Sequence, residues 1–226
     1  MNKYAVIVAG GFGTRMGNAV PKQFLLLNNK PVIYYPINVF LKAYDVMQII
    51  LVLPEQFMNA GKEIVDQYFD HDRIHLTAGG ETRFHSVKNG LRLVKEESFV
   101  FVHDSVRCLV TVDLVQRCYE NCLRTGTAIP VVVAKDSVRL LSEDGTTSEP
   151  LERNKVLMVQ TPQCFHSQIL LPAYNVDYKA RFTDEATVVE AFGLKVSLVE
   201  GEERNIKITE PRDLSIAETF LNEVTV

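Results

Sequence analysis

The 226-residue sequence predicts an α/β fold, in which a mostly parallel sheet carries helices on both faces, together with an extended β-hairpin arm. Three observations lead to this prediction. Short, nearly continuous apolar runs recur along the chain, longer amphipathic segments alternate with them, and one polar stretch breaks the alternation. With 46% hydrophobic and 23% charged residues, the chain has enough apolar material for a core and is not expected to be disordered.

The apolar runs read as strands buried on both faces, because they contain few polar residues. They cover residues 4–9, 48–53, 74–78, 99–103, 128–133 and 195–199. The amphipathic segments read as helices and cover residues 31–44, 55–69, 82–94, 111–125, 183–192 and 211–223. Because strands that alternate with helices are joined by crossovers, the sheet should be Rossmann-like and mostly parallel.

Several of these helices carry recognisable start signals. Thr111 precedes an acidic first turn at Asp113, and Thr209 stands shortly before Pro211 at the start of the last helix. Pro36 lies inside the segment 31–44, so that helix should kink or begin late.

The polar stretch 135–160 interrupts the alternation. It holds Asp144-Gly145 as a turn signal between the apolar runs 137–141 and 156–160. This pattern predicts a β-hairpin arm inserted into a single domain that spans residues 1–226. An arm that leaves a compact body needs a surface for its apolar side chains, so we expect it to join two copies of the chain in a homodimer.

Composition limits the partners and the compartment. The 24 Lys and Arg against 28 Asp and Glu give a net charge of −4, so we expect no nucleic-acid partner, and an anionic ligand must meet a local group of cations. No apolar run approaches the roughly 18 residues of a membrane span, so no membrane association is expected. The four cysteines form no Cys-x-x-Cys pair, which favours buried thiols in a cytoplasmic protein.

A glycine-rich loop follows the first predicted strand. Residues 9–17 read Ala-Gly-Gly-Phe-Gly-Thr-Arg-Met-Gly, and glycines at the carboxyl end of a strand let backbone N–H groups approach phosphate oxygens. The loop lacks the Gly-Lys-Ser/Thr of a Walker A motif and departs from the Gly-x-Gly-x-x-Gly spacing. Arg15 in the loop and Lys22 shortly after it add two cations, so we predict a phosphate-binding site.

Two more groups follow predicted strands. Gly80 and Ser86 stand in the turn after residues 74–78, where backbone and hydroxyl groups suit a nucleotide base. Asp104 follows residues 99–103, a position suited to ribose hydroxyls or to a metal on the phosphates.

The remaining candidates are a lysine and a histidine. Lys207 stands in the extended segment 205–209, where a lone lysine would normally face solvent. Beside Arg15 and Lys22 it becomes a third candidate cation for the reacting phosphates. His103 fits a packed strand residue better than a metal ligand, because the five histidines show no ligand spacing.

Seven motifs carry a family resemblance. In order they are Ala-Gly-Gly-Phe-Gly-Thr-Arg-Met-Gly, Pro-Lys-Gln, Gly-Gly-x-x-Arg-x-x-Ser-Val, His-Asp-x-x-Arg, Gln-Thr-Pro-Gln-x-Phe, Thr-Asp-Glu-Ala and Asn-Ile-Lys-Ile-Thr-x-Pro-x-Asp-Leu. The set resembles the 2-C-methyl-D-erythritol 4-phosphate cytidylyltransferases of the non-mevalonate isoprenoid pathway, from Ala5 to about Leu221. The resemblance implies a fold similar to nucleotide-diphospho-sugar transferases. The glycine loop alone is shared with many sugar-nucleotide pyrophosphorylases, whereas the ordered set is far more specific.

The resemblance also implies a reaction. CTP and a polyol phosphate, 2-C-methyl-D-erythritol 4-phosphate, would give CDP-methylerythritol and pyrophosphate, with Mg²⁺ or another divalent cation as cofactor. Arg15 and Lys22 match residues that grip the triphosphate and stabilise the transition state, and Lys207 matches the lysine that touches both reactants. The metal would be held by Asp104 or by the triphosphate alone.

Two sets of binding residues follow from the same resemblance. The nucleotide side comprises Ala9, Gly10, Gly11, Gly13, Gly80, Ser86, Asp104 and Ser105. The polyol-phosphate side comprises Arg107, Ser137, Arg153, Thr161 and Thr183. Because the family exchanges the arm between subunits, Arg153 and Thr161 would act in the partner's site.

Alternatives follow from small departures. Ser105-Val106 replaces the family's usual Ala-Ala, and Ser137 replaces a common Thr, which leaves room for a different polyol. A ribitol-5-phosphate cytidylyltransferase is therefore the nearest alternative, although Thr183-Asp184-Glu185-Ala186 favours the erythritol type. A non-catalytic nucleotide-binding regulator is an alternative of another class, which the three retained cations disfavour. A dehydrogenase is disfavoured by the glycine spacing.

Overall fold

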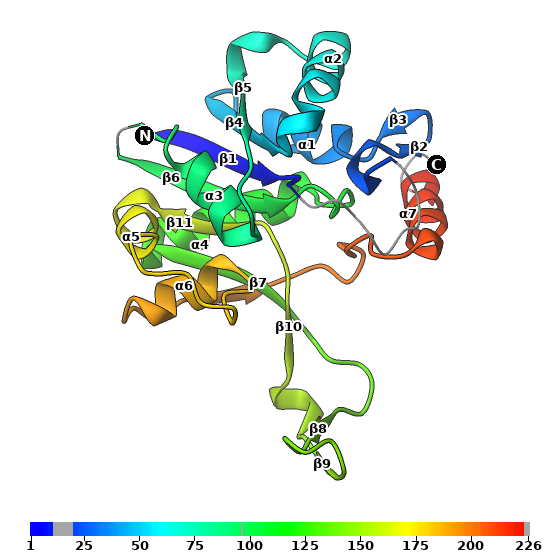
Figure 1. The fold of residues 1–226 in the computed structure, drawn as a ribbon, viewed down its shortest axis with the longest axis vertical. Coiled ribbons are helices and arrows are strands. Elements are labelled where there is room, and N and C mark those ends of the chain that lie inside the picture. The colour runs from blue at the N-terminus through cyan, green and yellow to red at the C-terminus, as the bar shows by residue number, and fades with distance from the viewer. Residues whose placement is uncertain (11–19, 96, 224–226) are drawn as a thin grey trace.

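A computed structural model describes residues 1–10, 20–95 and 97–223 of the chain. The predicted site residues Gly11, Gly13 and Arg15 lie outside these ranges. The body of the molecule is an eight-stranded sheet in the order β10-β7-β11-β6-β1-β4-β5, with β12 also paired to β7 (Figure 1). Its strands are β1 (Asn2–Val8), β4 (Met47–Leu53), β5 (Ile74–Ala78), β6 (Ser98–Asp104), β7 (Thr127–Val133), β10 (Leu157–Val159), β11 (Gln163–His166) and β12 (Leu198–Glu200).

The sheet is mostly parallel, as predicted. Strand β1 pairs in parallel with β6 and β4, β4 with β5, and β12 with β7. Strand β11 runs antiparallel between β6 and β7 and was not among the predicted strands, because its four residues are too few to form a visible run. This reversal places the start of β11 at the same edge of the sheet as the end of β6, since Gln163 pairs with Val102.

Seven α-helices lie in the described part of the chain. They are α1 (Tyr34–Ala43), α2 (Met58–Tyr68), α3 (Arg83–Leu91), α4 (Val112–Thr125), α5 (Ser167–Ala173), α6 (Glu185–Ala191) and α7 (Pro211–Glu223). The late start predicted from Pro36 is confirmed, because α1 begins at Tyr34 and the proline sits in its first turn. Thr111 caps α4 as predicted, its hydroxyl accepting from the Leu114 N–H at 3.0 Å.

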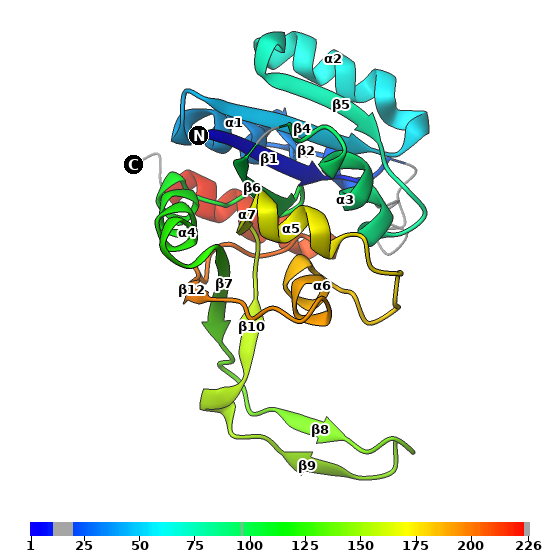
Figure 2. The same cartoon turned by 90° about the vertical axis from the view of Figure 1, so that its left-hand side faces the viewer.

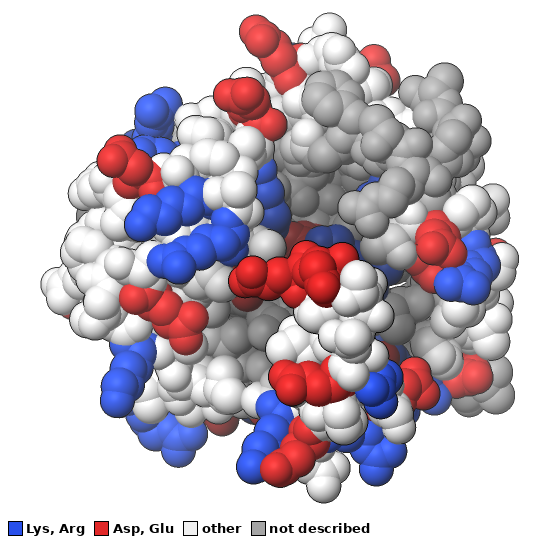
Figure 3. All heavy atoms as spheres, turned by 60° about the horizontal axis from the view of Figure 1, so that its bottom comes forward, with Lys and Arg blue, Asp and Glu red and all other residues white. Residues whose placement is uncertain are grey.

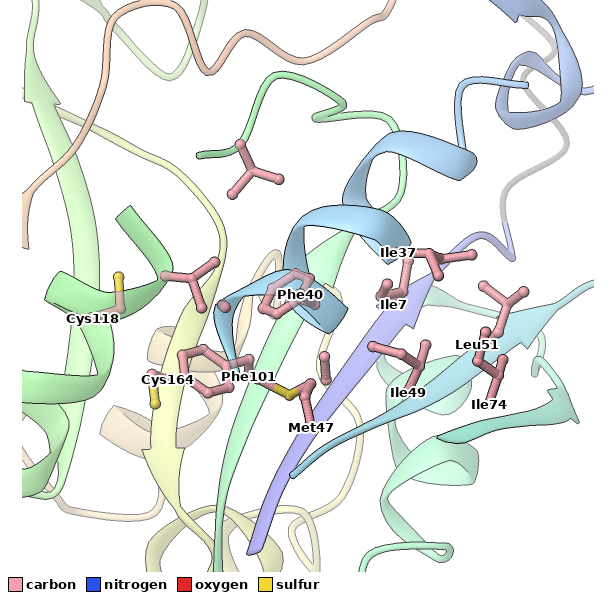
Figure 4. Packing of buried hydrophobic residues seen from close by; sticks show 14 of the residues in the cluster. Ile7, Ile37, Phe40, Met47, Ile49, Leu51, Ile74, Phe101, Cys118 and Cys164 are labelled. Atoms are coloured by element: carbon pink, nitrogen blue, oxygen red, sulfur yellow. The ribbon is translucent and has the colours of Figure 1, made fainter. Parts of the chain in front are cut away.

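Alternating side chains of the strands build a core on each face of the sheet. Ile7 of β1 and Phe101 of β6 face α1 and α4, where Phe40 and Cys118 pack against them (Figure 4). Val6 faces the opposite layer, which is made by α3, α5 and α6. The alternate side chains of the neighbouring strands face the same layer. A smaller cluster, centred on Ile208, packs α7 against the short hairpin β2 (Leu26–Leu27) and β3 (Lys30–Pro31). All four cysteines are buried and unpaired, as expected.

The arm extends far from the body, with β8 (Arg139–Leu141) and β9 (Ser148–Pro150) at its distal end (Figure 2). The predicted pairing of 137–141 with 156–160 is wrong. Strand β8 pairs with β9, and residues 157–159 return to the body as β10, antiparallel to β7. The turn around Asp144 explains this, because its side chain accepts from Ser142 and Thr146 and closes a tight hairpin locally. No helix in the described residues is long and apolar enough to cross a membrane.

Candidate functional site

The predicted site residues gather at the carboxyl edge of the central strands. Ala9 and Gly10 follow β1, Gly80 follows β5, and Asp104 ends β6. The register holds them together, because Val8 is paired with Asp104 and the Ser105 N–H donates to the Val8 carbonyl at 3.0 Å. The ends of neighbouring parallel strands thus bring residues from separate motifs to one edge, which is where open α/β sheets bind ligands.

Ser86 reaches this edge from the first turn of α3. Its hydroxyl oxygen accepts from the Gly80 N–H at 3.1 Å and donates to the Thr82 carbonyl at 2.9 Å. A Cβ on Gly10 would stand 2.9 Å from the Ser86 oxygen, so only glycine allows the end of β1 to approach this turn so closely. The Ser86 hydroxyl therefore holds the turn together with its proton and one of its two lone pairs.

Asp104 is the centre of a charged network. Its Oδ1 accepts from Arg83 Nε at 3.0 Å, and its Oδ2 accepts from Lys207 Nζ at 2.7 Å. Arg83 also forms a two-point ion pair with Glu185, at 2.6 Å and 3.0 Å. The Asp104 side chain is 11% exposed and that of Lys207 is 42% exposed, so the lysine stands at the solvent side of the network.

The two acidic and two basic groups stabilise each other's charged forms. Burial alone would raise the pKa of Asp104, but Arg83 and Lys207 outweigh burial and hold that pKa well below its ordinary value. Burial would lower the pKa of Arg83, and the carboxylates of Glu185 and Asp104 raise it well above its usual range. Asp104 and Arg83 are therefore both charged at neutral pH.

Thr161 binds the backbone of Asp104, and His103 holds Thr161 in place. The Thr161 hydroxyl accepts from the Asp104 N–H at 3.1 Å and lies 3.1 Å from His103 Nδ1. His103 Nε2 lies 3.1 Å from the Arg107 carbonyl, which can only accept, so the ring proton is on Nε2 and Nδ1 accepts from Thr161. Thr161 is thus tied to the site of its own chain, and its single proton is already used.

We expect His103 to stay neutral over the whole physiological range. Its side chain is fully buried in β6, and burial lowers its pKa to about 4. Imidazole resonances followed by NMR should show the Nε2–H tautomer of His103 unchanged from pH 8 to about pH 5. Protonation of His103 at its ordinary pKa would contradict the assigned hydrogen bonds.

Lys22 contacts the segment that carries Lys207, although the two lysines are far apart in the chain. Lys22 Nζ donates to the Ile208 carbonyl at 2.7 Å, next to Lys207. The segment is fixed on its other side by Arg107, whose Nη1 donates to the Asn205 carbonyl at 2.8 Å. The Nε of Arg107 is buried and has no hydrogen-bond partner among the described residues. Two of the three predicted cations therefore reach the segment around Ile208, and one of them, Lys207, binds Asp104.

The arm residues lie apart from this group. Ser137 is exposed, and exposed Arg153 donates to the Lys135 carbonyl at the base of the arm. Thr183 is exposed immediately before α6, whose start is capped by the Asp184 carboxylate accepting from the Thr187 N–H. Of the predicted substrate-side residues, Arg107 and Thr161 lie at the site of their own chain, whereas Ser137 and Arg153 belong to the arm.

Asp104, the predicted metal ligand, is surrounded by cationic side chains. Both of its oxygens already accept from cationic groups, Arg83 and Lys207. Across residues 1–10, 20–95 and 97–223, no three His, Cys, Asp or Glu side chains are grouped so as to hold a metal. Asp104 is therefore better suited to binding the cationic side chains around it than to coordinating a metal ion.

Arg83 and Glu185 were missed as candidate site residues. Both stand inside quoted motifs, Gly-Gly-x-x-Arg and Thr-Asp-Glu-Ala, but the spacing of 102 residues between them hides their contact. The sequence signal for both is a charged residue within the first three positions of a predicted helix, 82–94 for Arg83 and 183–192 for Glu185.

Similarity to known proteins extends over nearly the whole chain. A sequence model of the 2-C-methyl-D-erythritol 4-phosphate cytidylyltransferase family matches residues 4–223. Proteins of that name from Phocaeicola vulgatus and Bacteroides thetaiotaomicron are 46% and 45% identical to this chain, over 98% of it and 100% of their own length. Among solved structures, the 4-diphosphocytidyl-2C-methyl-D-erythritol synthase of Anaerococcus prevotii has a TM-score of 0.84 at 26% identity, covering 98% of both chains. The Francisella tularensis cytidylyltransferase has a TM-score of 0.79 at 32% identity, covering 97% of this chain and 99% of its own.

Proposed function

The chain belongs to the 2-C-methyl-D-erythritol 4-phosphate cytidylyltransferase family, and from this we propose that it transfers CMP from CTP to 2-C-methyl-D-erythritol 4-phosphate, giving CDP-methylerythritol and pyrophosphate in isoprenoid precursor biosynthesis. One observation carries the assignment of this chemistry to particular residues. Lys207 Nζ binds Asp104 at the carboxyl edge of the sheet, where the glycine loop also begins, and Lys22 Nζ binds the carbonyl of the next residue, Ile208.

In the proposed reaction, an oxygen of the substrate phosphate attacks the α-phosphorus of CTP. A new P–O bond forms while the bond from that phosphorus to the bridging oxygen breaks, and pyrophosphate leaves with the electron pair. A phosphate monoester is already an anion near neutral pH, so no strong base is required. The main obstacle is the repulsion between two anions, and cations fixed in advance reduce it with little reorganisation.

We assign the residues to two sides of this reaction. Arg15 and Lys22 would hold the triphosphate and its developing charge, and Lys207 would contact both reactants. The nucleotide side would consist of Ala9, Gly10, Gly11, Gly13, Gly80, Ser86, Asp104 and Ser105, largely through backbone groups. The polyol-phosphate side would consist of Arg107, Thr161 and Thr183, with Ser137 and Arg153 from an arm. The hydrogen bond from Arg107 to the Asn205 carbonyl, in the segment that carries Lys207, supports its place in this set.

The divalent cation is proposed to be held by the phosphate oxygens of CTP. The two cations that already bind Asp104 favour this arrangement over direct ligation by the carboxylate. When bound, such an ion supplies Lewis-acid stabilisation of the triphosphate. The residues themselves supply the fixed positive charges and the orientation of the attacking phosphate.

A homodimer formed through the arm is part of the proposal, with residues 135–160 as its contact element and residues 1–226 as one nucleotidyltransferase domain. Leu140, Leu141 and Met158 of this segment are all more than half exposed, and a cavity of about 530 Å³ at the arm base is lined in part by Arg153 and Glu203. The face from which the arm projects carries both charge signs intermixed, so apolar side chains are the better candidates for a contact (Figure 3).

Shortening the arm should abolish the dimer. Replacement of residues 138–151 by a short Gly-Ser turn is expected to give a monomer in sedimentation, because it removes the exposed leucines of the arm. It should also raise the KM for the polyol phosphate by about tenfold or more, which is the order of magnitude of losing one charged contact. The single change Arg153→Ala should raise that KM without changing the mass. Unchanged mass and kinetics of the shortened protein would remove the arm from both roles.

The function itself is tested by incubating the protein with each of the four nucleoside triphosphates and with either methylerythritol phosphate or ribitol 5-phosphate. Pyrophosphate release is expected only with CTP and methylerythritol phosphate. Release with ribitol 5-phosphate alone would assign the alternative substrate, and no release with any pair would favour the non-catalytic nucleotide-binding regulator. The buried, unpaired cysteines support a cytoplasmic location, which cell fractionation tests.

A further inference from the structure

Two charged residues of the network, Arg83 and Glu185, have no part in the proposed reaction. We propose that the Arg83–Glu185 pair is a positioning element that fixes the direction of the Asp104 carboxylate and, through it, the place of the Lys207 ammonium. Neither residue is then a catalytic residue, since neither would touch the reactants. This inference rests on the proposed function only for its kinetic consequence.

Arg83 is fully engaged by protein carboxylates. Its Nη1 and Nη2 donate to the two oxygens of Glu185, and its Nε donates to Asp104 Oδ1. All three nitrogens of the guanidinium thus meet a carboxylate, in the planar fork that arginine offers and lysine does not. Three of the five N–H groups of Arg83 are thus already used by protein carboxylates, which favours a structural role for this arginine over a role as a further phosphate-binding cation.

Glu185 is anchored from several sides. Its side chain is fully buried, and one oxygen accepts from the Tyr174 hydroxyl at 3.0 Å. It is the first residue of α6, and Gln163 of β11 fixes that helix start by accepting from the Ala186 N–H at 3.0 Å and donating to Asp184 at 3.0 Å. The Glu185 carboxylate is therefore a rigid reference point for the guanidinium.

The fixed Asp104 carboxylate in turn determines the position of the Lys207 ammonium. Because Arg83 holds Oδ1 of Asp104, the other oxygen, Oδ2, is turned to Lys207 at 2.7 Å. Lys207 is 42% exposed and Asp104 is its only hydrogen-bond partner within the described ranges, so nothing else there fixes its ammonium. Without Glu185, two neighbouring cations would compete for one carboxylate, and the lysine, being the more exposed, would be the one to leave.

The experiment compares Glu185→Gln with a matched variant in the same helix. Glutamine keeps the size of Glu185 but removes the charge that balances Arg83. Val189→Ala removes buried apolar contacts of α6 without touching the network, so it reports the effect of a weakened helix alone. Arg83→Lys forms a third variant, which retains the charge and loses the fork.

We expect Glu185→Gln and Arg83→Lys each to lower kcat by about 10- to 100-fold, the scale of a reacting group displaced by about 1 Å, while the Kd for CTP changes less than threefold. Val189→Ala should lower the melting temperature and leave kcat within twofold. Glu185→Asp should restore part of the activity lost in Glu185→Gln, since it restores the charge. Equal losses in Val189→Ala and Glu185→Gln, or kcat unchanged in Glu185→Gln, would overturn the inference.

A second measurement does not depend on turnover. A crystal structure of Glu185→Gln is expected to show Lys207 Nζ beyond hydrogen-bond distance from Asp104, and an undisturbed pair would overturn the inference. If wild-type protein turns over none of the substrates, the proposed function fails, whereas this structural result still decides whether the pair positions Lys207.

Discussion

Replacement of Lys207 by Ala is expected to lower kcat by about 10²–10³-fold, the usual effect of removing one fixed electrostatic donor from a reacting centre. The ammonium is held 2.7 Å from Asp104, close to the point where Lys22 binds the Ile208 carbonyl, so its charge is fixed before substrate arrives. A flexible surface lysine would instead need to be ordered during the reaction. Steady-state kinetics with CTP and methylerythritol phosphate measure the effect.

Lys62→Ala is the matched control for this prediction. Lys62 is exposed on α2, on a different element from all the candidate site residues, and its removal should leave kcat unchanged. Lys22→Ala should resemble Lys207→Ala in size. A loss of less than tenfold in both lysine variants, with melting temperatures unchanged, would reject the convergence of these two cations on one phosphorus.

Asp104→Asn is expected to lower the free energy of unfolding by about 3 kcal/mol, because it leaves cationic groups facing a neutral amide at a buried position. The loss lies at the low end of such effects, since Arg83 keeps Glu185 and Lys207 can turn to solvent. Urea unfolding at pH 7 measures it. Asp113→Asn, which removes a 77% exposed carboxylate paired with Arg117, should change this energy by less than about 0.5 kcal/mol.

The same variant should alter how stability depends on pH. The folded pKa of Asp104 lies well below its unfolded value of 3.8, so its stabilising contribution is complete above that value and is lost as pH falls through and below it. His103 acts at higher pH. Its folded pKa of about 4 lies below its unfolded pKa of 6.5, so the stability it contributes is lost as the pH decreases from 6.5 to about 4. Asp104→Asn should therefore flatten the curve below about pH 4, and an unchanged slope there would contradict the network.

Much of the fold could be predicted from the sequence because the central strands are buried on both faces. That burial demands continuous apolar runs, such as 48–53, which coincide with β4 within one residue. Strand β11 could not be predicted, because its four residues include a buried Gln and follow a proline. The arm's pairing was misjudged because strand pairing at 137–160 depends on turn geometry and on the free edge of β7, and periodicity reports neither.

The site was predictable where chemistry lies next to a strand end, as at Asp104 and Gly10. It was not predictable where two distant residues satisfy each other, as Arg83 and Glu185 do across 102 positions. Ser86 shows a related limit. Its position after a strand predicts a contact with the nucleotide, whereas the use of its proton and one lone pair within the turn cannot be read from the sequence.

The contacts that assemble the two lysines also have a consequence for the order of folding. Lys22 reaches the Ile208 carbonyl across 186 positions, and Asp104 reaches Lys207 across 103, whereas β1, β4 and β5 come from the first third of the chain. Long loop closures are entropically late events, so the sheet can form while the cationic centre is still unassembled. Catalytic competence is then the last property a refolding chain gains and the first that mild denaturant removes.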